Sequence, residues 1–297
     1  MRVGFGLPVA GSWATRENFV EIATTAERLG YHSVWTFQRL VSPADRSIPP
    51  TYWSVVDPVV ALGAAAALTE RVELGVAVLN MPFFSPPLLA KQLAAVDVLS
   101  GGRLVAGLGN GWQPIEFEAS GVPIEGRGVR AEEYLGVLRR LLGPDPVAYD
   151  GPLYRLQPAE VLPKPVNPEG IPILLGGDAP TALARAGRRA DGWISSSRVP
   201  PSELHTRIAQ VKRAAQDAGR DPDALRFVCR GVVVGGERTR PLSGPLEQVR
   251  DDVAQLAEQG VTEVFVDLNF DPSIGHPAAD PRASMDRARE VLEALRP

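Results

Sequence analysis

Residues 2–37 read RVGFGLPVAGSWATRENFVEIATTAERLGYHSVWTF and contain one complete unit of the pattern that decides the fold. Residues 2–7 form a short apolar run, typical of a β-strand. Thr15 then offers an N-cap to a helix whose apolar residues recur at helical spacing, and Gly30 ends that helix. A second apolar run at 33–37 predicts the next strand. The stretch therefore predicts strand, helix and strand in succession.

The same alternation continues to the end of the chain. Further strands are expected at 71–79, 103–108, 171–175, 192–195, 226–234 and 263–268. Helices are expected at 57–68, 86–99, 131–142, 182–189, 202–218, 246–258 and 282–295. Because the strands lack clean polar and apolar alternation, they read as parallel strands covered by helices. Eight such pairs in about 300 residues predict a (β/α)8 TIM barrel, with an open doubly wound sheet as the alternative.

One segment breaks the alternation. Residues 143–170 are dense in proline, and 147–156 around Asp150-Gly151 predict a small hairpin. We interpret 1–297 as a single barrel domain in which 143–170 is an insertion. The proline-rich segments 43–52 and 144–168 are candidate lids, or caps of the barrel.

Composition narrows the class of protein. The chain has 297 residues, 44% of them hydrophobic, and a net charge of -4 with scattered basic residues, so neither nucleic acid nor an anionic membrane is an expected partner. The sequence has no apolar run of about 20 residues and enters a strand at once, which favours a cytoplasmic protein. The single cysteine, Cys229, lies in an apolar run and predicts a buried, inert thiol.

In a barrel of this kind, the chemistry belongs at the carboxyl ends of the strands. The residues at these ends should share one rim, and they are Pro8, Gln38, Arg39, Asn80, Gly109 to Trp112, Gly176 to Ala179, Ser195 and Asn269. Several tryptophan and phenylalanine residues near strand ends, Phe37 and Trp112 among them, could wall a pocket for a planar ring or pack as ordinary core.

Two glycine-rich turns on this rim are candidate ligand sites. Gly176-Gly177-Asp178 opens a helix, so backbone N–H groups and the helix dipole could receive a phosphate there, although the same geometry makes an ordinary turn. Asp178 would repel a phosphate unless its carboxylate caps the helix. Gly107 to Gly111 permits close approach of a flat ligand and departs from the dinucleotide-binding fingerprint.

Few side chains on the rim are suited to acid-base work. Arg39 could neutralise an anionic substrate or cofactor, or form a surface salt bridge. The three histidines, His32, His205 and His276, have no metal-ligand spacing, so we predict neither a metal nor a histidine base. Catalysis by side chains alone is therefore poorly supported.

Four blocks together resemble the luciferase-like, flavin- or F420-dependent oxidoreductases. They are AERLGYHSVW at 26–35, LGVAVLN at 74–80, LSGGR with GLGNGW at 99–103 and 107–112, and PILLGG with ARAG and ADGW at 172–177, 184–187 and 190–193. The variant WTFQRL at 35–40 is more similar to the probable F420-dependent oxidoreductases of this group than to its light-emitting or alkane-oxidising members.

The resemblance implies a cofactor site. A non-proline cis peptide falls at Ala77-Val78, behind the cofactor ring, with Val78 and Leu79 as ring contacts. The cofactor phosphate falls at Gly176 to Ala179, and the other implied binding residues are Pro8, Asn80, Gly109, Asn110, Gly111 and Trp112. Where the family commonly has Asp-His, this chain has Gln38-Arg39, which would orient substrate or cofactor. Some sugar-phosphate dehydrogenases of the group have glutamate at Trp112, so that substrate class is not expected.

The resemblance thus implies an F420-dependent oxidoreductase that transfers a hydride between the deazaflavin and a small organic substrate, as a homodimer. Two alternatives stay open. One is an FMN-dependent two-component monooxygenase of the same group. The other is a non-catalytic flavin- or deazaflavin-binding protein, which the missing histidine would suit.

Overall fold

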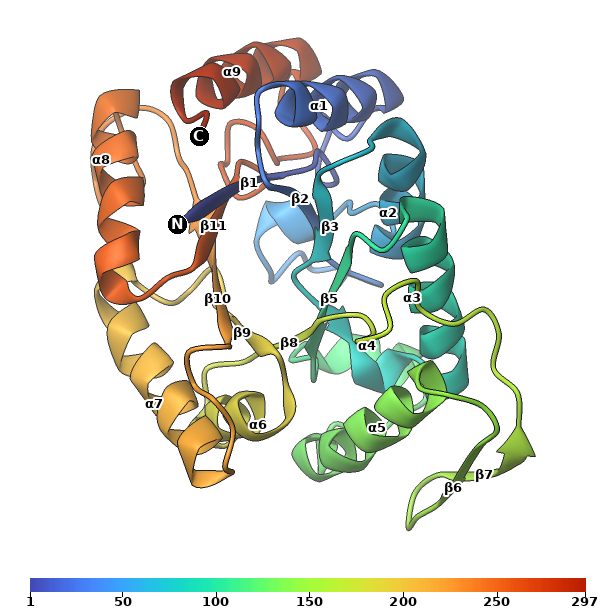
Figure 1. Ribbon diagram of the computed structural model, residues 1–297. Coiled ribbons are helices and arrows are strands. Elements are labelled where there is room, and N and C mark those ends of the chain that lie inside the picture. The colour runs from blue at the N-terminus through green and yellow to red at the C-terminus, as the bar shows by residue number, and fades with distance from the viewer.

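The computed structural model describes residues 1–297 and is built around a closed barrel of parallel strands. The barrel strands are β1 (Arg2–Gly6), β2 (Ser33–Thr36), β3 (Glu73–Val76), β4 (Leu79–Asn80), β5 (Leu104–Gly109), β8 (Ile173–Gly176), β9 (Gly192–Ile194), β10 (Arg226–Val232) and β11 (Glu263–Asp267). Pairing of β3 with β5 joins the two ends of this sheet, so the expected (β/α)8 barrel is confirmed and the open doubly wound sheet is wrong. Figure 1 looks into the ring of strands.

The third barrel strand is interrupted. The sequence predicts one strand over 71–79, and the structure has β3 and β4 separated by Ala77 and Val78. The peptide bond between these two residues is cis, as the family resemblance implies. The ladder of β3 with β2 and β5 therefore ends before Val78, and the ladder of β4 with β5 resumes at Leu79. This irregularity lies at the carboxyl end of the barrel.

Helices surround the barrel, and Figure 1 shows them as an outer ring. They are α1 (Arg16–Arg28), α2 (Pro58–Leu68), α3 (Pro86–Ser100), α4 (Pro114–Ala119), α5 (Arg127–Leu142), α6 (Pro180–Arg189), α7 (Leu204–Asp217), α8 (Leu246–Leu256) and α9 (Pro281–Ala294). The predicted N-caps Thr15 and Asp57 accept backbone N–H groups of the first turns of α1 and α2. None of the helices combines the length and apolarity needed to cross a bilayer.

The segment after the fourth barrel strand differs from its prediction. The short helix α4 occupies what the sequence presents as a polar excursion, and α5 begins at Arg127, four residues before the predicted start. Gly126, at φ +66°, supplies the left-handed turn that lets the chain enter α5 so early. Neither start carries a side-chain cap, which is the signal that the sequence analysis relied on.

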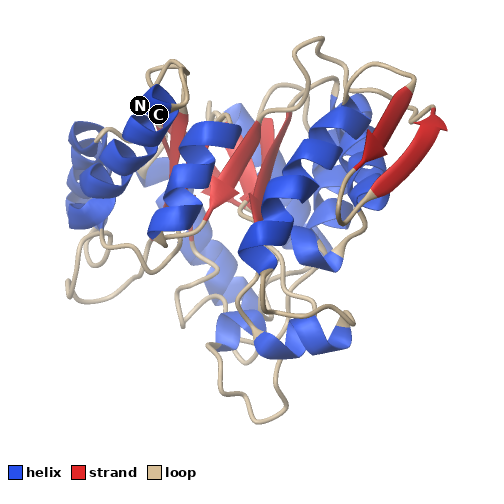
Figure 2. Cartoon of the chain, turned by 90° about the horizontal axis from the view of Figure 1, so that it is seen from below, coloured by secondary structure: helices blue, strands red, loops and turns tan.

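The predicted hairpin is present as β6 (Val147–Asp150) and β7 (Arg155–Ala159), which pair antiparallel. Figure 2 shows it outside the ring of helices, away from the barrel strands. It is fastened to α5, because the Glu133 carboxylate accepts the backbone N–H groups of Leu153 and Tyr154, and the Tyr134 and Tyr154 rings meet edge to face. The insertion thus packs on the outside of the barrel.

Packing divides the interior into two apolar clusters. The larger lies between strands and helices and contains 63 buried residues. The smaller contains seven, one each from six strands and the interruption at Ala77, and they contact one another only because they point inward. Trp35 and Phe265 stack within it, with ring centroids 4.9 Å apart. This cluster is the floor on which the carboxyl end of the barrel is built.

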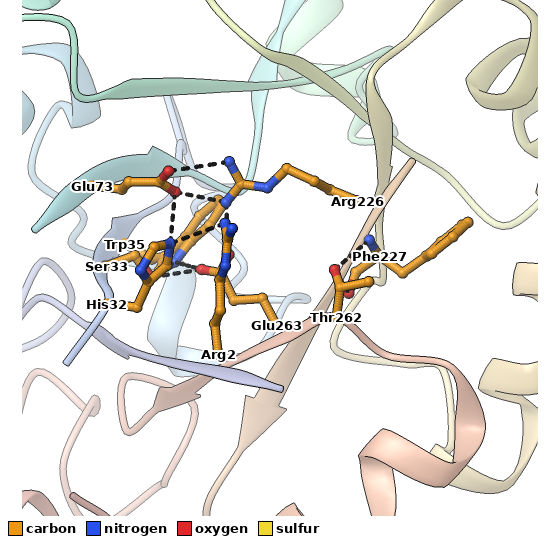
Figure 3. Close-up of polar contacts among 9 residues, drawn as sticks. All are labelled: Arg2, His32, Ser33, Trp35, Glu73, Arg226, Phe227, Thr262 and Glu263. Atoms are coloured by element: carbon orange, nitrogen blue, oxygen red, sulfur yellow. Dashed lines mark hydrogen bonds and ion pairs between the residues drawn. The ribbon is translucent and has the colours of Figure 1, made fainter. Parts of the chain in front are cut away.

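A polar network closes the opposite end of the barrel (Figure 3). The Arg226 guanidinium donates to Glu73 Oε2 at 2.6 Å and to Glu263 Oε2 at 2.7 Å, and so joins three strands. Ser33 Oγ donates to the second oxygen of Glu263 at 2.6 Å, and His32 Nε2 lies 3.2 Å from Glu73. The charges of Arg226, Glu73 and Glu263 are therefore paired with one another, as their burial requires.

Candidate active site

A pocket of about 740 Å³ opens at the carboxyl ends of the strands. Of the fifteen residues that the sequence analysis names as cofactor or substrate contacts, thirteen line it: Gln38, Arg39, Ala77, Val78, Asn80, Gly109, Asn110, Gly111, Trp112, Gly176, Gly177, Asp178 and Ala179. Residues as far apart in the sequence as Gln38 and Ala179 thus share one cavity, because parallel strands end on the same side of a barrel. Their roles in binding stay predictions.

The other two named residues, Pro8 and Leu79, do not line the pocket. Leu79 pairs with Leu108 across β4 and β5, and its side chain belongs to the larger apolar cluster between strands and helices. Because side chains alternate along a strand, a neighbour of the inward-facing Val78 faces outward. Pro8 is buried beyond the end of β1. Leu79 is therefore left out of the candidate site, and its predicted contact with a cofactor ring has no support from the pocket lining.

Glycines make room for the interruption in the third strand. A Cβ at Gly109 would lie 2.5 Å from Val78 Cγ2, and one at Gly176 would lie 3.2 Å from Val78 Cγ1. Real Cβ atoms essentially never come within 3.0 Å of such a neighbour, so the Val78 side chain requires glycine at 109, whereas a Cβ at 176 would make a tight contact that needs a small shift. The result is a smooth apolar surface, formed by Val78 between two strand ends, at one wall of the pocket.

Hydrogen bonds from the side-chain amides of two residues link three strand ends. Gln38 Oε1 accepts Asn80 N at 2.9 Å and Asn80 Nδ2 at 3.1 Å, and Asn80 Oδ1 accepts Gly111 N at 2.9 Å. Because a backbone N–H must find an acceptor in Gln38, the orientation of its amide is fixed. The side chain that stands at one of the family's Asp-His positions therefore holds the rim in shape.

The glycine turn before α6 is open as predicted, but Asp178 does not act as its cap. Gly177 adopts φ +120°, and its carbonyl accepts Trp193 Nε1 at 2.9 Å. The residue at the N-cap of α6 is Ala179, and no side chain caps this helix. Asp178 Oδ2 instead accepts the Ser196 hydroxyl at 2.8 Å, and its Oδ1 has no partner. Asp178 therefore does not make the capping contact under which it would not repel a phosphate, and its carboxylate lies in the pocket lining beside the N-terminus of α6 without bonding to it.

Arg39 is not a surface residue. Its guanidinium forms a buried ion pair with Glu116 of α4, whose other oxygen accepts Leu40 N at 2.8 Å. Burial raises the pKa of the Glu116 carboxyl, against the hydrogen bond from Leu40 and the charge of Arg39, and burial also lowers the pKa of Arg39. Because an arginine pKa normally exceeds 12, the Arg39 guanidinium stays charged at neutral pH. The open alternative of a surface salt bridge is wrong.

Sequence reasoning missed a second buried arginine. Arg230 of β10 lines the pocket, donates from Nη2 to the carbonyl of Ala77, and has Nε 3.6 Å from Asp267 Oδ2. Phe270 was also not predicted, and with Tyr52 of the candidate lid 43–52 it completes an aromatic wall beside the expected Phe37 and Trp112. Arg230 lies inside an apolar run, and a cation at an inward-facing strand position is the signal that would have found it.

Only one of the two candidate lid segments lines the pocket. The segment 43–52 contributes Pro49 and Tyr52 to the pocket, whereas 144–168 contributes nothing because the hairpin packs outside α5. The pocket instead gains Arg127 and Gly128 from the start of α5 and Ser196 to Arg198 from the segment after β9. The prediction of 144–168 as a lid is wrong.

The histidines lie away from this pocket. His32 is in the network of Figure 3, where its ring and the carboxylates of Glu73 and Glu263 place ligand-type atoms within 4.8 Å of one another. Spacing between histidines could not reveal this cluster, because its acids come from distant strands. Arg226 already bonds both carboxylates, so the cluster is compensated by protein charge.

Comparison with known proteins fits this geometry. The sequence profile of the luciferase-like monooxygenase family matches residues 3–240. The chain belongs to this family.

The uncharacterized protein Rv0940c of Mycobacterium tuberculosis is 30% identical over 285 residues, 92% of each chain. An F420-dependent glucose-6-phosphate dehydrogenase of Amycolatopsis mediterranei is 30% identical over 184 residues, which are 61% of this chain and 53% of that protein. Among solved structures, the monooxygenase RslO1 of Streptomyces bottropensis superposes with a TM-score of 0.81 at 22% identity over 99% of this chain and 98% of that one.

Members of this family are oxidoreductases, and the proteins similar to this chain point to a flavin or deazaflavin cofactor. The likeness to RslO1 is a likeness of fold, because sequence identity is too low to carry function. Which cofactor this chain takes, and on what substrate, depends on the pocket itself.

Proposed function

We propose that this protein is an F420-dependent oxidoreductase that transfers a hydride between the deazaflavin and a small organic substrate. The observation that carries the proposal is the surface formed by Val78 between Gly109 and Gly176, next to the open N-terminus of α6 in the same pocket. A flat ring needs the first feature and a phosphate needs the second. Both occur together only at this end of the barrel.

The residues present fit such a cofactor. The ring would rest on Val78, whose side chain the two glycines admit, and the phosphate tail would lie along Gly176 to Ala179. Bound there, a deazaflavin supplies a ring carbon, carbon 5, that accepts or donates a hydride. Val78 would shield one face of the ring, so the substrate has access only to the other face, which the aromatic wall bounds.

The protein's own part is binding, orientation and exclusion of water. No histidine lines the pocket, and Glu116 behind it is held by Arg39 and Leu40 N. Gln38 and Arg39 are fixed in place by Asn80 and Glu116, so we assign them the orientation of substrate rather than proton transfer. Trp112, at the site of a glutamate in some sugar-phosphate dehydrogenases of the group, argues for another substrate class.

The choice of deazaflavin over FMN is supported by the F420-dependent relative and by the WTFQRL variant. An FMN-dependent monooxygenase and a non-catalytic binding protein are the competing functions. A homodimer belongs to the proposal as a consequence of the family resemblance, and light scattering after size-exclusion chromatography tests it. A cytoplasmic location belongs to it because the sequence has no long apolar run.

Equilibrium dialysis against F420 and against FMN tests the proposal. We expect micromolar binding of F420 and weaker binding of FMN. Micromolar binding of FMN without binding of F420 would reverse the choice in favour of the monooxygenase. If F420 binds and its reduced form is oxidised by no acceptor in a panel of carbonyl, imine and conjugated alkene compounds, the binding-protein alternative is correct.

A further inference from the structure

Two guanidinium groups lie on one aromatic wall of the pocket. The Arg39 guanidinium carbon is 4.5 Å from the centroid of the Tyr52 ring, and that of Arg230 is 5.0 Å from the Phe270 ring. Tyr52 and Phe270 meet edge to face, with centroids 5.5 Å apart. All four side chains line the pocket, so the two cations are fixed on the same continuous surface.

Each guanidinium turns one edge toward the protein and leaves another free. Arg39 uses Nη1 on Glu116 and also interacts with the Tyr52 hydroxyl, so only part of its five N–H donors is used within the protein. Arg230 uses Nη2 on the carbonyl of Ala77 and faces Asp267 through Nε, while its Nη1 bonds nothing in the protein and is not sealed from the pocket. A charged N–H donor that a ligand dehydrates must find an acceptor in that ligand.

The charges around this wall favour an anion as that acceptor. Arg198 lies with its guanidinium carbon 5.6 Å from the Trp112 ring and forms no ion pair, which adds a third cation at the mouth. The one carboxylate in the lining is that of Asp178, which accepts the Ser196 hydroxyl beside α6. The acids that neutralise Arg39 and Arg230 lie behind the wall and do not line the pocket.

We propose that the free edges of Arg39 and Arg230 bind the carboxylate of a planar aromatic or conjugated acid, whose ring packs against Tyr52 and Phe270. Guanidinium matches a carboxylate in geometry as well as charge, and an aromatic wall favours a flat, apolar body. The inference rests on the proposed function in that this acid is the substrate of the same site. It adds Arg230 to the residues that select the substrate.

Titration with trans-cinnamate, followed by ligand-observed NMR, tests this site, with cinnamyl alcohol as the neutral probe of the same planar shape. We expect cinnamate to bind at least about tenfold more tightly than the alcohol, the effect of one charge-assisted pair. Arg230→Met should remove this preference and leave alcohol binding within about twofold. Arg155→Gln, in the exposed hairpin, is the matched control and should bind both probes as wild type does.

Equal binding of cinnamate and cinnamyl alcohol to the wild-type protein would overturn the inference, as would an unchanged preference in Arg230→Met. If Arg230→Met does not fold, Arg230→Lys keeps the charge without the planar fork, and a preference undiminished in that variant counts against the site. Repeating the titration with saturating FMN or F420 distinguishes a substrate site from a cofactor site. Loss of cinnamate binding under both conditions would assign the arginines to the cofactor and reject the inference. Preferential cinnamate binding in a protein that binds neither cofactor would reject the proposed function and keep the carboxylate site.

Discussion

Val78 occupies space that exists only because residue 109 is glycine: a Cβ at Gly109 would lie 2.5 Å from Val78 Cγ2. The two residues come from neighbouring barrel strands, one from the interruption between β3 and β4 and the other from the end of β5. The proposed cofactor surface therefore depends on the absence of a Cβ atom at residue 109.

Gly109→Ala should displace the Val78 side chain into the pocket. We expect the affinity for the cofactor to fall at least about tenfold, and the free energy of unfolding to fall by about 1–3 kcal/mol from overpacking. Equilibrium dialysis and urea unfolding measure the two effects. Gly63→Ala in α2 is the matched control, because nothing lies within 4 Å of the added Cβ, and it should gain about 0.5–1 kcal/mol. Unchanged cofactor affinity in Gly109→Ala would remove Val78 from the site.

Glu116→Gln should destabilise the protein strongly. The substitution keeps the shape of the side chain but leaves the Arg39 charge buried without a partner, and breaking such a pair costs about 3 kcal/mol or more. Urea unfolding at pH 7 measures the loss. Glu21→Gln, which removes the partner of the exposed Arg289, should cost no more than about 1 kcal/mol. Similar losses in the two variants would mean that Arg39 is well solvated.

The fold could be predicted because its signals are local. Apolar runs of strand length repeat along the chain, caps such as Thr15 and Asp57 mark some of the helices, and the number of units selects the barrel. The errors in the elements lie after β5, in a polar stretch where neither a cap nor a clear apolar pattern marks the helix starts. Both α4 and α5 begin without a side-chain cap, so the first was missed and the second was predicted to begin too late.

The site could be predicted in outline but not in its charges. Barrel topology places strand ends on one rim, and this is enough to collect Gln38, Asn80, Gly109 and Gly177 in one pocket. It does not indicate which distant side chain pairs with which. Glu116 meets Arg39 across 77 positions, so the ion pair and the carboxylate site proposed above required the structure.

Cys229 should be unreactive in the folded protein. Burial raises the pKa of its thiol to about 11, against the hydrogen bond with Ser195, so almost no thiolate is present at pH 8. We expect Ellman's reagent to titrate no thiol in native protein and one in urea. Modification of native protein within minutes would show that β10 opens readily at this position.

The polar network at the amino end of the barrel should govern part of the loss of unfolding free energy at low pH. Burial opposes ionisation of Glu73, but hydrogen bonds from His32 and Arg226 outweigh it and lower the pKa of Glu73 from 4.5 to about 2. Because the folded pKa lies below the unfolded one, the stabilisation is complete above about pH 5 and is lost as the pH falls toward 2. At about 1.4 kcal/mol per pKa unit, it amounts to about 3 kcal/mol.

Glu73→Gln should remove this contribution. Other carboxylates will still destabilise the protein in acid, so the informative quantity is the difference between the unfolding free energies of wild type and variant, measured in urea from pH 2.5 to 7. That difference should shrink steadily below pH 5, because protonated Glu73 resembles glutamine in charge. Glu118→Gln, at an exposed position without an ion pair, should give a difference near zero at every pH. A Glu73→Gln difference that does not change with pH would show that Arg226 binds Glu263 alone, and that the Glu73 contact in Figure 3 contributes packing rather than charge.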